Sequence, residues 1–180
     1  MLDRFVRYAK INTRSDLNSS AVPTTKSQLD FLQMLEQELK ELGFSNISLD
    51  LEDAYLVACI PSNLPEGKTA PSIGFVAHVD TADFNAENIQ PQVHLNYDGE
   101  DVLLNSELGL MMRVEEFPNL KNYIGQTLIT TDGTTLLGAD DKAGLVSILE
   151  AVIDLLEKPE IPHGDIWVAF GPDEEIGKGA

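Results

Sequence analysis

Apolar residues recur at helical spacing in three segments of the chain. We expect a short amphipathic helix over residues 2–11, a second helix over residues 25–42 and a third over residues 141–157. The second segment opens with Thr25 and has Gln28 three residues later, which is the pattern of a capping box at a helix N-terminus. Its leucines form one apolar stripe, whereas the third segment is apolar over a wider face. The pattern therefore predicts three helices that pack on a common core.

Shorter apolar runs predict strands at residues 55–60, 72–78 and 166–170. The run at 72–78 is nearly continuous, which is typical of a strand buried on both faces of a sheet. Residues 127–137 hold two β-prone runs around an Asp-Gly pair and predict a hairpin. The stretch 81–126 is interrupted by polar and turn residues, so we expect irregular structure with short hairpins. Strands alternating with helices predict an α/β fold with a mostly parallel mixed sheet flanked by helices.

Composition narrows the function classes. The 180 residues carry 12 Lys and Arg against 30 Asp and Glu, a net charge of −18. This balance argues against nucleic acid and anionic membranes as partners. No apolar run reaches the length of a membrane span, and Cys59 is the one cysteine, so an internal disulfide cannot form. Without the pattern of a signal peptide at the start of the sequence, we expect a cytoplasmic protein. An ordinary acidic protein has the same total charge, so only the placement of particular acids bears on function.

Candidate ligands stand at the ends of the apolar runs, in three groups: His78 with Asp80, Asp140 with Asp141, and Asp173 with Glu174 and Glu175. Open α/β sheets bind their ligands where strands end and helices begin. If the three ends converge on one edge of the sheet, their imidazole and carboxylate groups would form a metal site.

Each group also has a structural interpretation. Asp80 lies two residues after His78, so both side chains point the same way and Asp80 can orient the imidazole; a strand-end hydrogen bond without metal is the alternative. A carboxylate of the Asp140-Asp141 pair can bridge two cations, or the pair can simply stabilise the helix dipole. Adjacent side chains at 174 and 175 diverge, which favours one metal ligand and one general base. Asp173 by itself is explained as part of a solvated acidic loop.

Taken together, the motifs resemble those of the aminotripeptidases of the zinc exopeptidase family, which also holds bacterial dipeptidases, acetylornithine deacetylase and succinyl-diaminopimelate desuccinylase. The resemblance covers essentially the whole chain. It rests on residues 77–81 (AHVDT), 137–144 (LGADDKAG) and 170–177 (FGPDEEIG), with further likeness at 125–133 and 161–166.

The resemblance implies roles for five residues. His78 matches a ligand of one zinc ion, Asp140 the carboxylate that bridges two zinc ions, and Glu175 a ligand of the second. Glu174 matches the catalytic base and Asp80 the acid that orients His78. A cis peptide bond between Asp140 and the next residue is also implied.

Family members are considerably longer chains. We therefore expect residues 1–180 to be the N-terminal part of the catalytic domain, without the lid domain and without the remaining Asp and His ligands. The implied activity is zinc-dependent removal of the N-terminal residue of tripeptides, with the isolated chain inactive because ligands are missing. The alternatives are a related di-zinc dipeptidase or deacylase, or a non-catalytic fragment that forms homo-oligomers through an exposed sheet edge.

Overall fold

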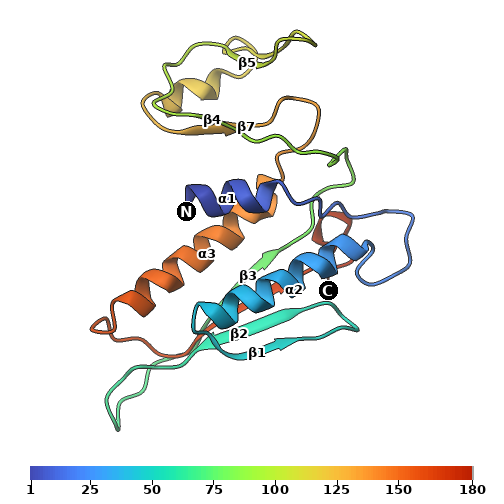
Figure 1. The fold of residues 1–180 in the computed structure, drawn as a ribbon. Coiled ribbons are helices and arrows are strands. Elements are labelled where there is room, and N and C mark those ends of the chain that lie inside the picture. Colours follow the sequence, from blue (N-terminus) through green and yellow to red (C-terminus); the bar gives the residue numbers. More distant parts are fainter. Residues whose placement is uncertain (180) are drawn as a thin grey trace.

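A computed structural model describes residues 1–179 of the chain (Figure 1). The main body contains three helices and four strands: α1 Leu2–Ala9, α2 Lys26–Glu41, α3 Ala139–Glu157, β1 Ser45–Leu49, β2 Leu56–Ile60, β3 Ile73–His78 and β8 Ile166–Gly171. The three predicted helices and the three predicted strands are thus present. The first strand of the main sheet, β1, was not expected from the pattern.

The four strands form one mixed sheet in the order β1-β2-β8-β3. Strand β3 runs parallel to β8, with Ile73 opposite Ile166 and His78 opposite Gly171. The pairs β1-β2 and β2-β8 are antiparallel. An α/β fold with a mixed sheet flanked by helices is confirmed, but the expectation of mostly parallel pairing is wrong. Only β3 and β8 are joined by a long crossover that carries a helix, which is the connection that parallel strands need.

One face of this sheet is covered by α2 and α3, and α1 packs on α3 (Figure 1). Leu35 of α2, Leu149 of α3 and Phe170 of β8 are fully buried in the core between these layers. The prediction that residues 72–78 are buried on both faces is wrong, because β3 is an edge strand and Val76 is 72% exposed. Its last residues nevertheless reach the core, so the end of β3 is well anchored.

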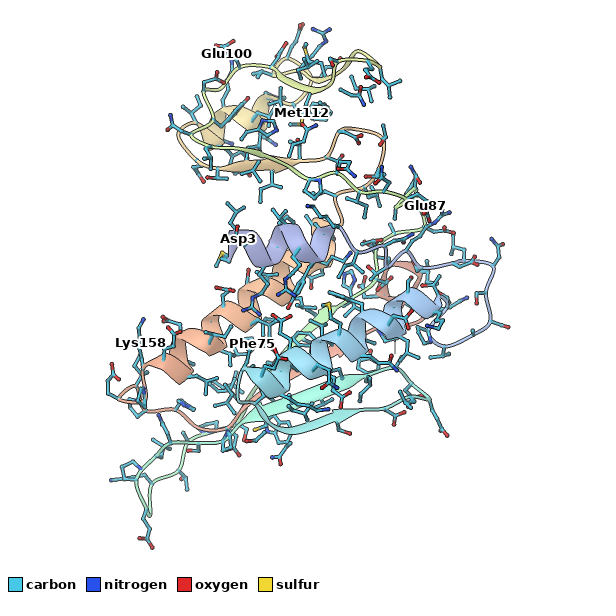
Figure 2. The ribbon with its side chains drawn as sticks, viewed as in Figure 1. Asp3, Phe75, Glu87, Glu100, Met112 and Lys158 are labelled. Atoms are coloured by element: carbon cyan, nitrogen blue, oxygen red, sulfur yellow. The ribbon has the colours of Figure 1, made fainter. Side chains whose placement is uncertain are left out.

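A small lobe projects from the main body on the far side of α1, where Figure 2 labels Glu100 and Met112. It contains two two-stranded sheets and a 3₁₀ helix: β4 Gln92–His94 with β7 Leu128–Thr130, β5 Val102–Asn105 with β6 Leu110–Met112, and Pro118–Tyr123. The hairpin predicted for residues 127–137 is wrong, because β7 pairs with β4. The Asp-Gly pair does turn the chain, since the Asp132 carboxylate accepts hydrogen bonds from the Thr134 amide and hydroxyl. The turn returns the chain to the main body at α3.

The helices within residues 1–179 are all too short or too polar to cross a bilayer.

Candidate metal centre

The parallel pair β3 and β8 brings two of the sequence groups together. His78 is the last residue of β3, and the turn Glu174–Ile176 follows the end of β8. Asp140 arrives from the other side, at the start of α3. One ligand atom each of His78, Asp140 and Glu175 can be chosen so that all three lie within 4.8 Å of one another. Three segments far apart in the sequence therefore meet at one point on the edge of the sheet.

His78 is held between carboxylates on both ring nitrogens. Its Nδ1 lies 3.1 Å from Oδ1 of Asp80, and its Nε2 lies 3.0 Å from Oδ1 of Asp140 and 3.7 Å from Oε2 of Glu174. Burial lowers the pKa of His78, but the hydrogen bond and charge of Asp80, the hydrogen bond of Asp140 and the charge of Glu174 raise it to about 9. The Nε2 atom thus faces an excess of negative charge, which also attracts a metal cation.

Asp80 connects this histidine to the acidic turn. It is fully buried, and its carboxylate accepts the main-chain N–H of Glu174 at 3.0 Å and that of Glu175 at 3.2 Å. The same carboxylate contacts the Nδ1 atom of His78. One side chain therefore fixes the orientation of the imidazole and the position of both glutamates.

The two neighbouring aspartates at the start of α3 have different environments. Asp140 is 83% exposed and faces His78, whereas the Asp141 carboxylate accepts the main-chain N–H of Gly144 at 3.0 Å. Asp141 therefore caps the helix, as short polar residues do at helix N-termini. The peptide bond between them is cis, as the family resemblance implied. This division leaves Asp140 free to act as a ligand.

Glu174 and Glu175 also diverge. The Glu174 side chain is 65% exposed and lies over His78, while Glu175 belongs to the group of three that could hold an ion. Burial and the charge of Asp140 raise the pKa of Glu175, with His78 opposing them. One imidazole nitrogen and two carboxylates form a donor set that zinc accepts. The residues present fit such an ion.

Three residues that the sequence motifs did not assign support the site from behind. Lys142 is fully buried, donates a hydrogen bond to the Ile11 carbonyl at 2.6 Å and has its pKa lowered by burial to about 7, against the opposing charge of Asp80. Asp173 is 1% exposed and bonded to Gln28, so its interpretation as a solvated loop residue is wrong. The burial of Asp173 and Lys142 depends on contacts with residues far away in the sequence, so it could not be recognised from the motifs alone.

Comparisons with known proteins show what the chain is similar to. Residues 128–180 match the model of Peptidase family M20/M25/M40. Over 178 residues the chain is 60% identical to a protein named Peptidase T from Fusobacterium nucleatum, covering 99% of this chain and 42% of that protein. It is 54% identical to a Peptidase T from Enterococcus faecalis, covering 100% and 44%. A crystal structure of a tripeptidase from Staphylococcus aureus matches with a TM-score of 0.62 at 25% identity, over 98% of this chain and 36% of that one.

The chain spans less than half the length of the curated relatives that it matches. The matched part includes the segments that carry His78, Asp140 and Glu175, because the alignments extend over essentially all 180 residues. Identity of 54–60% at this coverage makes the chain a homologue, over its whole length, of the Peptidase T proteins.

Proposed function

We propose that this chain is part of a zinc-dependent aminopeptidase that removes the N-terminal residue of tripeptides. The observation that carries the proposal is the convergence of His78, Asp140 and Glu175 in a chain 60% identical to a protein named Peptidase T. The names of the relatives support peptidase activity, and the convergent donor set supports dependence on a metal. We further propose that residues 1–180 are the N-terminal part of the catalytic domain. The single cysteine, Cys59, which is buried in β2, is consistent with a cytoplasmic location.

In this proposal His78, Asp140 and Glu175 would hold two zinc ions, with the Asp140 carboxylate shared between them. Zinc bound in such a site polarises the carbonyl of the scissile peptide and makes a water molecule more acidic. Glu174, exposed beside His78 and outside the ligand group, takes the proton from the attacking water and delivers it to the leaving amine. Asp80 holds His78 in the tautomer that leaves Nε2 free for the metal.

A test of these roles needs the remainder of the enzyme. A chimera in which the 180 residues replace their matching segment in the Fusobacterium relative would be assayed for tripeptide hydrolysis. Glu174→Ala should abolish turnover while bound zinc stays at the parental amount, and Glu175→Ala should lose zinc together with turnover. Loss of one zinc equivalent in Glu174→Ala would exchange the two roles or refute both.

The same chimera separates the rival activities. A di-zinc dipeptidase or deacylase of this family would cleave dipeptides or N-acyl amino acids in preference to tripeptides. We expect the highest kcat/KM for tripeptides with a free amino terminus. A higher value for an N-acyl amino acid would replace the aminotripeptidase assignment with a deacylase.

For the isolated chain we propose no peptidase activity. Three potential metal ligands converge among residues 1–179. One tetrahedral zinc ion needs four ligands, and a site for two ions needs more. We also propose that the exposed edge strand β3 allows two copies to pair. Chelator-sensitive release of an N-terminal residue by the chain alone would contradict the first statement, and a concentration-independent monomer mass in sedimentation would contradict the second.

A further inference from the structure

The carboxylate of Asp173 is buried directly behind the two exposed glutamates. Its Oδ2 accepts the main-chain N–H of Thr24 at 2.7 Å, and its Oδ1 accepts the amide of Gln28 at 2.7 Å and the Thr24 hydroxyl. The Gln28 side-chain oxygen in turn accepts the main-chain N–H of Asp173 at 3.1 Å. Both carboxylate oxygens and the Asp173 amide are therefore satisfied by two residues near the start of α2.

One of these contacts uses a side chain that stands at a capping position of α2. Gln28 has the capping-box position of α2, yet it is fully buried and directed at Asp173. Asp173 itself has a left-handed backbone conformation, with φ 57° and ψ 24°. This conformation is uncommon for a residue other than glycine, and Asp tolerates it better than most. It turns the chain sharply from the end of β8 into the segment that carries Glu174 and Glu175.

The acidic turn is thus held from two sides. The Asp80 carboxylate accepts hydrogen bonds from the main-chain amides of Glu174 and Glu175. Asp173, the residue just before them, is hydrogen-bonded to Thr24 and Gln28 near the start of α2. The two glutamate side chains project from a backbone that has little freedom to move, which matters because ligands and bases must be fixed to within a fraction of an ångström.

We propose that Asp173, Thr24 and Gln28 form a positioning clamp that sets Glu174 for proton transfer and Glu175 for metal binding. The proposal rests on the function proposed above. None of the three residues touches the metal group directly; they act through the backbone of the turn. A role confined to the fold would instead change global stability and leave the turn and the metal affinity as they are.

The test compares hydroxyl deletions at two buried threonines in the 180-residue chain. Thr24→Val removes a donor to Asp173 but keeps the size of the side chain and its main-chain N–H. Thr131→Val is the matched control, because the Thr131 hydroxyl is also buried, donates to the Thr135 carbonyl at 3.0 Å and lies outside the contacts of Asp173, Thr24 and Gln28. Thr24→Ser restores the hydroxyl and should restore the parental behaviour. Asp173→Asn, which replaces one acceptor with a donor facing other donors, is the stronger variant.

The first measurement is amide hydrogen exchange of the metal-free protein, and it does not depend on the zinc proposal. Thr24→Val should speed exchange at the Glu174 and Glu175 amides by about 10-fold or more, with the amides of β8 unchanged. Thr131→Val and Thr24→Ser should exchange like the parent. Unchanged exchange at residues 174–175 in Thr24→Val, or an equal rise throughout β8, would overturn the clamp.

The second measurement is zinc affinity by titration calorimetry on the same proteins. Mutation of a residue that holds a metal ligand in place typically lowers metal affinity by about 10–100-fold. Thr24→Val should therefore weaken zinc binding by about 10-fold while the protein stays fully folded. Parental affinity in Thr24→Val and in Asp173→Asn would overturn the clamp. If the parent chain binds no zinc, the same titration is made on the chimera, which carries the remaining ligands. Absence of zinc there refutes the metal site of the proposed function, and the exchange measurement still decides the clamp.

Discussion

The acidic residues around His78 fall into an inner and an outer set with opposite surroundings. The inner set, Asp80 and Asp173, is buried, and every carboxylate oxygen of these two residues accepts a hydrogen bond. The outer set, Asp140, Glu174 and Glu175, reaches the surface, with Asp140 and Glu174 mostly exposed. Burial of a charge is tolerated only where hydrogen bonds replace its hydration. The inner set therefore holds the architecture, and the outer set keeps its oxygens available for an ion and a substrate.

The largest effect on stability is expected for the inner residue Asp80. Asp80→Ala leaves the amides of Glu174 and Glu175 without their acceptor and removes the negative charge that stabilises the buried Lys142 ammonium. Unsatisfied buried groups cost about 1–3 kcal/mol each, so we expect unfolding free energy to fall by about 2–3 kcal/mol, with zinc binding lost. Asp80→Asn, which keeps the size and one acceptor, should fold and bind zinc weakly. Urea unfolding and zinc titration on the same preparations measure both; zinc affinity unchanged in folded Asp80→Ala would contradict its orienting role.

An intermediate effect is expected at Glu38, a carboxylate that serves the fold far from the metal group. It accepts hydrogen bonds from Arg4, Arg7 and Tyr8, which join α1 to α2. Burial works to raise the pKa of Glu38, but the hydrogen bonds of Arg7 and Tyr8 and the charges of both arginines hold it below its usual value. Glu38→Gln should cost about 1–2 kcal/mol at pH 7, as bonds to charged groups do, and leave zinc affinity unchanged.

The pH dependence of this loss follows from the sign of the shift. A carboxyl whose pKa is lowered by folding contributes stability above its unfolded pKa, and the contribution disappears as pH falls through the lowered folded value. The difference between parent and Glu38→Gln should therefore be constant near neutrality and shrink below about pH 4–5. A difference that grows on acidification would show that the bonds to Glu38 do not stabilise the fold.

The smallest effect on stability is expected for the outer set. Glu175→Ala removes a carboxylate whose pKa is raised by burial and by Asp140, so its charge is not favoured in the fold. Unfolding free energy should change by no more than about 0.5 kcal/mol, whereas zinc affinity should fall at least about 10-fold. A large loss of stability with unchanged zinc affinity would place Glu175 in the inner set and contradict the division of these acids by burial.

The sequence allowed the prediction of what depends on local spacing. The helices follow from apolar periodicity, and the contact of Asp80 with His78 follows from their separation by two residues in an extended segment. Strand β1 was missed because its five residues mix serine and asparagine with two apolar residues and carry a register irregularity. The exposure of β3 could not be predicted from its apolar run. Such a run shows that a strand is suited to burial, but it does not show which segment of the chain covers it.

The burial of Asp173 and of Lys142 lay beyond prediction for a different reason. Asp173 is separated from Thr24 by 149 residues and Lys142 from Ile11 by 131. Spacing along the chain carries no information on such partners, and an isolated Asp or Lys beside a motif looks solvated until the fold closes around it. The separation of Asp140 from Asp141 into ligand and helix cap likewise depends on the backbone at the start of α3.

Anomalous diffraction at the zinc edge, from crystals of the chain grown with zinc, would locate the ion among these acids. We expect a peak bonded to Nε2 of His78, at about 2.0–2.1 Å, and to carboxylate oxygens of Asp140 and Glu175, with Asp80 still on Nδ1 and Asp173 still on Thr24 and Gln28. A peak bound to Asp80 or Asp173, or zinc found only away from His78, would contradict the division into inner and outer acids.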